Sequence, residues 1–381
     1  MATLDFEDFL LNGDNSGMDR QLIELDYKPH LPAKMDYGIA VIGCGSIVTH
    51  ATIPCYRAHN LNIIGCYDID PQAAHKLAQR FGITKVYDDL GALQRDPAVD
   101  IVEIAIHPRD QLSIAREMSA AGKHLLCQKP LSDVFAKAVE TVRIARAAGV
   151  KLAVNQQMRW DQAIRAAKRL IDDGWIGKPI GVTIDASFFV PIPGSWYADL
   201  PRYEIFFHSI HYLDSIRFLF GSPEWVTSRH AKYPLEGKVM GETQTVTILD
   251  YSSGLQAVVA ANMCDRTYDH FVTYRLLGTE GLIKGTIGLL KYPAGEPDTL
   301  IWSSLKRSSE LRFQANLEGT YLFDSFIGPI GSLMEAIQSD GVPETDGADN
   351  LETLRICEAA YASAAENRSV RPSEIGKGLE A

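Results

Sequence analysis

One lysine of this sequence is well placed for chemistry on a hydroxyl group. Lys129 follows an apolar run at residues 124–127, in which we expect a buried β-strand. The side chain should therefore lie at the carboxyl edge of a sheet, where ligands bind in open α/β folds. A lysine that points into a cleft can donate to a hydroxyl and stabilise the alkoxide that develops there. A lysine in solvent is the alternative.

Two histidines form a second candidate for proton transfer. His208 and His211 lie in a helix that we expect near residues 205–220, so their spacing places them on one face, and Glu204 joins them four residues before His208. Imidazole suits proton transfer because its pKa lies near neutral pH. Two alternatives stay open: His208 as a buried structural histidine, and the three side chains as ligands of a divalent metal.

A glycine turn with a later acid predicts a dinucleotide site. An apolar run at residues 37–42 precedes the turn, and Asp68 ends the next expected strand, 25 residues after Gly43. Gly43 permits a tight turn, and Gly45 lets the backbone approach a pyrophosphate at the start of a helix. Val48 stands where a third glycine is usual. The expected cofactor-binding residues of the turn are Gly43, Cys44, Gly45, Ser46 and Ile47.

Asp68 also favours NAD over NADP. Its carboxylate is expected to hold the adenosine ribose hydroxyls, and a 2′-phosphate there would repel it. At about 4 Å and an effective dielectric constant of about 20, the repulsion is on the order of 4 kcal/mol before screening. No arginine or lysine follows Asp68 directly to offset it.

The chain alternates between strand and helix patterns up to about residue 160. Apolar strands separated by amphipathic helices predict an α/β, doubly wound parallel sheet over residues 37–160. Residues 161–381 instead carry short turns between strand-like runs, which indicates an α+β domain with a mostly antiparallel sheet. Residues 1–36 are interpreted as an arm along the body or a neighbouring subunit, with a mobile tail as the alternative.

Composition narrows the class of protein. The 381 residues carry a formal charge of −11, which disfavours nucleic acid and anionic membranes as partners. The acidic residues 1–8 do not resemble a signal peptide, and no apolar stretch is long enough for a membrane span. Six cysteines without paired spacing suggest free thiols, so we expect a cytoplasmic protein.

The order of several motifs resembles that of the Gfo/Idh/MocA oxidoreductases, from about Tyr37 to Arg371. Members of that family use a nicotinamide dinucleotide to oxidise sugars and polyols, so the resemblance implies NAD and a sugar or polyol here. The segments that carry it are the glycine turn with His50, Gly122-Lys123-His124-Leu125-Leu126-Cys127-Gln128-Lys129-Pro130, Asp173-Gly174-Trp175-Ile176-Gly177-Lys178-Pro179, His211-Tyr212-Leu213-Asp214 and Glu358-Ala359-Ala360-Tyr361-Ala362-Ser363.

The resemblance implies roles for two residues. A sugar hydroxyl would be held between Lys129 and His211, with His211 as general base while hydride leaves the carbon for NAD. Oxidation of a cyclic aldose at C1 would give a lactone. Gln128 replaces the family's glutamate, and this neutral neighbour should leave Lys129 more easily deprotonated. Phe207 stands where the family often has an aspartate, so His208 or Glu204 is expected to supply that polar contact.

Other residues are candidates for the same cleft. His107 and Pro108 end an expected strand at residues 99–106 and, with Gln128, should lie at the nicotinamide end of the site. Asn155 or Gln156 is expected to touch the nicotinamide ribose or the substrate. Arg159 either contacts the substrate or braces the domain junction.

An aromatic loop is a candidate lid. Trp196 and Tyr197 follow Pro191-Ile192-Pro193-Gly194, and aromatic rings stack on the C–H face of sugars. Packing against a partner subunit is the alternative. The family often forms dimers or tetramers through the second sheet, so a homodimer or homotetramer is expected.

The substrate stays open at this point. The helix and the aromatic loop resemble those of aldose dehydrogenases for small or branched sugars, which favours an aldose as the substrate. The second candidate function is that of an inositol or polyol dehydrogenase. Two other classes remain: a non-catalytic NAD-binding sensor, and an enzyme that keeps its NAD through an internal redox cycle.

Overall fold

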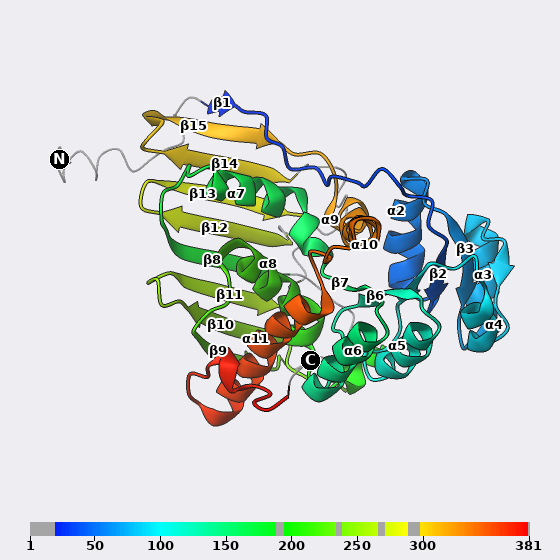
Figure 1. The fold of residues 1–381 in the computed structure, drawn as a ribbon. Helices are drawn as coiled ribbons and strands as arrows, with labels where there is room; N and C mark the ends of the chain where they lie inside the picture. The colour runs from blue at the N-terminus through cyan, green and yellow to red at the C-terminus, as the bar shows by residue number, and fades with distance from the viewer. Residues whose placement is uncertain (1–19, 188–193, 234–237, 266–270, 289–297, 380–381) are drawn as a thin grey trace.

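Two β-sheets lie side by side in a computed structural model of the chain, with helices between and around them (Figure 1). The structure describes residues 20–187, 194–233, 238–265, 271–288 and 298–379. Most of the expected N-terminal arm and the Pro191-Ile192-Pro193 part of the expected lid lie outside these residues. Within them, no helix combines the length and the apolar character that crossing a membrane requires.

The first sheet is fully parallel, as predicted. Its order is β4 (Lys85–Val86), β3 (Ile63–Tyr67), β2 (Ile39–Ile42), β5 (Ile101–Ile104), β6 (His124–Gln128) and β7 (Leu152–Asn155). All four residues of β2, β5 and β7 are buried, which explains their apolar runs. The chain reverses direction across the sheet between β2 and β5, and a ligand crevice opens at such a switch point.

Helices on both sides cover this sheet. They are η2 (Val48–Thr52), α2 (Ile53–Ala58), α3 (Pro71–Phe81), α4 (Leu90–Arg95), α5 (Gln111–Ala120) and α6 (Phe135–Ala147). Asp70 caps α3 by accepting from the Gln72 backbone N–H at 3.0 Å, and Gly82 ends it in the left-handed region. Sequence analysis missed β4 and α4, because both are too short for a periodic pattern to stand out.

The second sheet has nine strands and is mostly antiparallel, as predicted. Its order is β1 (Arg20–Leu22), β15 (Ser308–Asn316), β14 (Thr299–Ser304), β13 (Gly281–Ile287), β12 (Val272–Gly278), β8 (Pro179–Ser187), β11 (Gln256–Asn262), β10 (Gln244–Asp250) and β9 (Trp225–Ala231). Two pairs are parallel, β1 with β15 and β8 with β11. The strands β1, β9, β14 and β15 were not predicted.

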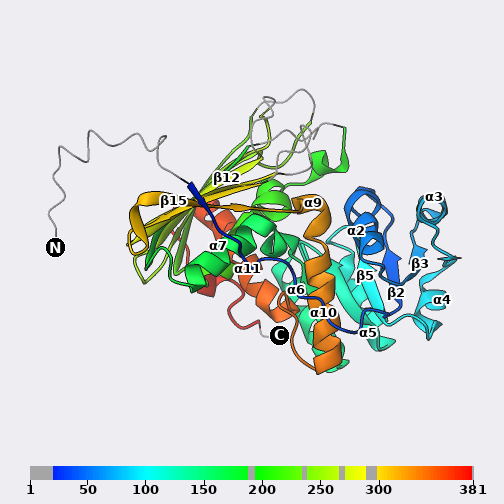
Figure 2. The same ribbon diagram turned by 90° about the horizontal axis from the view of Figure 1, so that it is seen from above.

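Helices cover one face of this sheet and lie between it and the first sheet (Figure 2). The helices that contact its strands are α7 (Gln162–Asp172), α8 (Ile210–Phe220) and α11 (Gly347–Glu366). The shorter helical segments of this part of the chain are η3 (Gln157–Trp160), η4 (Trp196–Asp199), η5 (Ile205–Ser209) and η6 (Pro372–Glu374). The predicted helix at 205–220 is thus continuous but begins with a π-helical turn. The other face of the sheet carries none of the helices in the described chain (Figure 2).

The C-terminal segment returns to the first sheet. After α9 (Tyr321–Asp324), helix α10 (Ile327–Ser339) lies beside the first sheet (Figure 2). Its Ile330 and Met334, with Phe326 just before the helix, belong to the core around β2 and β3. The backbone N–H of Val154 in β7 donates to the Thr345 carbonyl at 2.8 Å. Residues 161–381 therefore pack against the first sheet as well as forming most of the second. The sequence analysis, which expected a domain boundary at residue 160, did not predict this return.

Candidate active site

A cavity of about 960 Å³ lies between the two sheets, at the carboxyl edge of the first. It extends from the glycine turn past the ends of β5 and β6 to the helix that carries the two histidines. The residues that line it and enter the following account are Gly45, Ser46, Ile47, His107, Pro108, Gln128, Lys129, Gln157, Trp196, Tyr197, Phe207, His208, His211 and Tyr321. A cavity of this size suits a cofactor together with a small substrate.

The glycine turn fits a dinucleotide. Gly43 has φ +95°, and a Cβ there would lie 2.3 Å from the Ala105 carbonyl oxygen at the end of β5. Gly45 lines the cavity, and a Cβ built on it meets nothing within 4 Å. Only glycine fits at the first position, and open space beside the second leaves room for a pyrophosphate. The helix after the turn begins with the π-helical segment η2 at Val48, where a third glycine is usual.

Asp68 lies beside this turn, at the end of β3. One carboxylate oxygen accepts from the Cys44 backbone N–H at 2.7 Å, and the other accepts from the Asp70 N–H at 2.9 Å. These bonds fix the carboxylate at the rim of the turn and leave lone pairs for further donors. The position suits a carboxylate that receives the ribose hydroxyls of a bound dinucleotide.

Lys129 follows β6 and lines the cavity. Its Nζ donates to the Phe207 carbonyl oxygen at 2.5 Å, across the junction between the two sheets. Burial lowers the pKa of Lys129 to about 7. The amine therefore loses its proton more easily than that of an exposed lysine, and the cause is desolvation. The expected effect of the neutral neighbour Gln128 stays a prediction.

Gln111 and Glu103 bind the residues next to Lys129. The sequence analysis did not predict these contacts. The Gln111 side-chain amide donates to the carbonyl oxygens of Gln128 and Pro130, each at 3.0 Å, on both sides of Lys129. Glu103 is fully buried in β5, and the Gln128 amide approaches its carboxylate at 3.4 Å. Burial raises the pKa of Glu103 to about 7. In the sequence, the one sign of this role is that Glu103 is an acid inside the apolar run of residues 101–104.

Both histidines line the same cavity as Lys129. Burial, and then the charge of Lys129, lower the pKa of His208 and of His211 well below the usual histidine value. Each imidazole is consequently neutral at pH 7 and has a nitrogen that can accept a proton. His211 packs edge-on against Tyr321 with ring centroids 5.9 Å apart.

Glu204 points away from the cavity. Its carboxylate accepts from Ser209 Oγ at 2.7 Å and from Thr245 Oγ1 at 2.5 Å, and burial raises its pKa to about 7. No group of three histidine, cysteine or acidic side chains is arranged for a metal ion in the described part of the chain. Glu204, His208 and His211 are thus not assembled as a ligand set, and Glu204 does not replace the aspartate missing at Phe207.

Aromatic rings form the outer wall of the cavity. The Trp196 ring lies 4.1 Å from the Tyr197 ring and 5.5 Å from the Phe207 ring, centroid to centroid. Its edge meets His107 at 5.3 Å. The Trp196 side chain remains 50% exposed, so part of the indole is available to a ligand. The wall joins the segment of residues 194–200 to the end of β5.

The segment after β7 divides its polar groups between the cavity and the protein interior. Gln157 lines the cavity and donates to Tyr321 Oη at 3.2 Å. Gln156 is buried, and neither end of its amide has a hydrogen-bond partner among the described residues. Arg159 does not line the cavity; its guanidinium binds Asp214 and Asp349 behind it. Of its two expected roles, the geometry matches the brace.

Comparisons with known proteins identify the family of the chain. The family model "Oxidoreductase family, NAD-binding Rossmann fold" matches residues 37–156, and the model of the GFO/IDH/MocA C-terminal domain matches residues 164–284. The D-apiose dehydrogenase of Rhizobium rhizogenes is 30% identical, over 87% of this chain and 96% of its own. That of Paraburkholderia graminis is 27% identical, over 87% and 88%.

A solved structure shows the same fold. An oxidoreductase from Agrobacterium radiobacter, determined in complex with NAD+, L-tartaric acid and magnesium, superposes with a TM-score of 0.78. It is 24% identical, and the match covers 89% of this chain and 99% of that one.

Proposed function

The chain belongs to the Gfo/Idh/MocA oxidoreductase family, whose N-terminal domain is an NAD-binding Rossmann fold, and we propose that it oxidises a CH–OH group of a sugar. The observation that carries the proposal is the juxtaposition of Lys129 and two neutral histidines in one cavity with a glycine turn that fits a dinucleotide. Bound NAD supplies the hydride acceptor.

Lys129 and His211 divide the work on the hydroxyl. His211 accepts the hydroxyl proton on an imidazole nitrogen, for which its lowered pKa keeps it neutral. The Lys129 Nζ donates to the same oxygen and stabilises the negative charge that develops on it. Gln111 and Glu103 hold the Lys129 segment in place, and Gln128 faces the nicotinamide end of the cavity.

D-apiose is the sugar we propose, with oxidation at C1 to a lactone. The support comes from the relatives of that name and from a cavity whose wall is aromatic on one side. A screen of NADH formation over aldoses, polyols and inositols tests the choice. A higher kcat/KM for an inositol than for D-apiose would replace this substrate with the runner-up, an inositol or polyol.

We expect Trp196→Ala to raise KM for the sugar about tenfold, because the C–H face of the ring loses the exposed indole on which it stacks. kcat should change less than KM, since the indole does not touch the reacting hydroxyl. Steady-state kinetics separate the two constants, and Tyr233→Ala, an exposed ring outside the cavity, is the control. An unchanged KM would place the sugar elsewhere.

The wild-type protein is expected to prefer NAD over NADP at least about a hundredfold in kcat/KM, because a 2′-phosphate meets the Asp68 carboxylate. Asp68→Asn keeps an acceptor for the Cys44 N–H but removes the charge, so the preference should fall about tenfold or more. Asp70→Asn removes a neighbouring charge at the cap of α3 and should leave the preference unchanged. Comparable kcat/KM for both coenzymes with wild type would refute the role of Asp68.

We also propose a cytoplasmic homo-oligomer. All six cysteines are free in the structure, which suits a reducing compartment.

The face of the nine-stranded sheet away from the helices presents Val246, 47% exposed, beside Ile248 on the same face of β10. In a homo-oligomer, a second copy of the chain would cover Val246 and Ile248. Sedimentation of Val246→Lys beside wild type tests the interface, and equal masses would count against it.

A further inference from the structure

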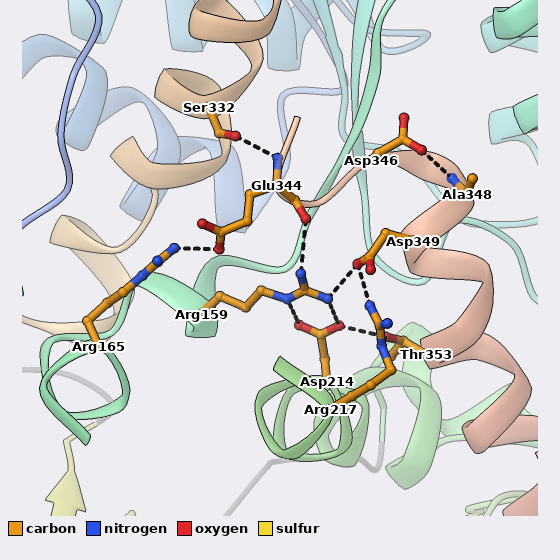
Figure 3. Close-up of polar contacts among 10 residues, drawn as sticks. All are labelled: Arg159, Arg165, Asp214, Arg217, Ser332, Glu344, Asp346, Ala348, Asp349 and Thr353. Atoms are coloured by element: carbon orange, nitrogen blue, oxygen red, sulfur yellow. Dashed lines mark hydrogen bonds and ion pairs between the residues drawn. The ribbon is translucent and has the colours of Figure 1, made fainter. Parts of the chain in front are cut away.

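A buried ion network fixes the helix that carries the histidines (Figure 3). The Arg159 guanidinium binds Asp214 through two parallel bonds, Nε to Oδ2 and Nη2 to Oδ1, each 2.7 Å long. Its Nη1 donates to the Glu344 carbonyl oxygen at 3.0 Å, and Nη2 also reaches Asp349 Oδ2 at 2.7 Å. The Arg159 and Asp214 side chains are only 4% and 1% exposed.

Further bonds fix the Asp214 carboxylate itself. Thr353 Oγ1 donates to Asp214 Oδ1 at 2.6 Å, and Arg217 Nε donates to Thr353 Oγ1 at 3.0 Å. Arg217 also pairs with Asp349 (Figure 3). Helix α8 supplies Asp214 and Arg217, while α11 supplies Asp349 and Thr353. The Asp214 carboxylate of α8 is consequently fixed by Arg159 from η3 and by Thr353 from α11.

The network joins the two halves of the candidate active site through rigid elements. Lys129 directly follows β6, which pairs with β7 through Gln128 and Asn155. Arg159 lies in η3, directly after β7, and Asp214 lies one turn after His211 on α8. Besides the bond from Lys129 Nζ to the Phe207 carbonyl oxygen, a second route therefore joins Lys129 to His211 through two paired strands, one buried ion pair and one helical turn.

The His211 ring depends on this helix for its position. Its Nδ1 is buried and has no hydrogen-bond partner among the described residues. Within the described part of the chain no carboxylate therefore orients this nitrogen, in contrast to the usual arrangement of a catalytic histidine. A displacement of α8 would carry the imidazole with it.

Stability alone is a weak reason to bury such a pair. Well-packed apolar side chains often replace a buried ion pair at no cost in stability, whereas the bidentate arginine–carboxylate geometry is specific. We propose that Arg159 and Asp214 are positioning residues that set the separation of Lys129 and His211. This inference rests on the proposed function, in which these two side chains share one hydroxyl.

The test compares Asp214→Asn with Ile216→Ala. The first keeps the shape of the side chain but disrupts the bidentate pair; the second removes a fully buried side chain from the same helix outside the network. We expect Asp214→Asn to lower kcat about tenfold to a hundredfold with NAD affinity unchanged, because catalytic groups must hold position within about 0.5 Å. Ile216→Ala should lower the Tm at least as much, with kcat within about twofold of wild type.

Crystal structures of both variants give a readout independent of turnover. The His211 imidazole should move relative to Lys129 by more than about 0.5 Å in Asp214→Asn but not in Ile216→Ala. If wild type oxidises no sugar, the proposed function fails, and this displacement alone decides the positioning role. An unmoved His211, or a loss of kcat equal to that of Ile216→Ala, would overturn it.

A second variant covers the case in which Asp214→Asn does not fold. The double variant Arg159→Met/Asp214→Leu leaves neither member of the pair uncompensated, so folding is expected to survive. Its kcat should fall as in Asp214→Asn, again with NAD affinity unchanged. Wild-type kcat in this folded double variant would also overturn the proposal.

Discussion

His211→Ala is expected to lower kcat for sugar oxidation about a thousandfold, since loss of a positioned general base costs about 10²–10⁴-fold. NAD affinity should stay within about twofold, because the glycine turn and Asp68 beside it lie on other elements than His211. Steady-state kinetics with titration of NAD into the apo-protein measure both quantities.

His208→Ala is the matched control for this prediction. It removes a second cavity-lining imidazole from the same face of the helix. If His211 is the base, His208→Ala should lower kcat by at most about tenfold. The reverse order of the two losses would move the base to His208, and near-normal turnover of His211→Ala would exclude His211.

Lys129→Met is expected to lower kcat/KM about 10²–10³-fold, because the developing alkoxide loses its charged donor in a water-poor site.

The direction of the pH dependence of kcat/KM follows from the lowered pKa of Lys129. Burial disfavours the charged amine, so Lys129 is protonated below about pH 7 and loses its proton as the pH rises through this value. The wild-type profile of kcat/KM should therefore fall above an inflection near pH 7.

Two substitutions separate this charge from other groups that titrate near neutrality. Lys129→Arg keeps a charge at every working pH, so any activity that remains should lack the inflection. Lys129→Met should lack it as well, at a much lower rate. Burial also raises the pKa of Glu103 to about 7, and Glu103→Gln tests that residue separately. An inflection that persists in both Lys129 variants would assign it to another group.

The sheet edge and its cofactor turn could be predicted because their signals are local. A glycine needed between two strand ends, an apolar strand before it and an acid after the next strand all stand within a short stretch of sequence. The structure explains each one: a Cβ at Gly43 would meet the Ala105 carbonyl, and the Asp68 carboxylate accepts from the turn. The alternation of strand and helix patterns likewise predicted that the first sheet is parallel.

The partners of the buried charged groups could not be predicted. Arg159 pairs with Asp214 and Asp349, which lie 55 and 190 residues further along the chain. Local patterns do not show which distant carboxylate satisfies a given cation, so the brace and the substrate contact remained equal alternatives. The same limit hid the return of α10 to the first sheet and the contact between the Gln111 amide and the carbonyls around Lys129.

The most direct test of the account is the formation of NADH by the purified protein with NAD and D-apiose, compared with His211→Ala and Lys129→Met. We predict NADH in proportion to the sugar consumed by the wild type, and losses of two or more orders of magnitude in both variants. A protein that binds NAD yet forms no NADH from any aldose, polyol or inositol would contradict the account.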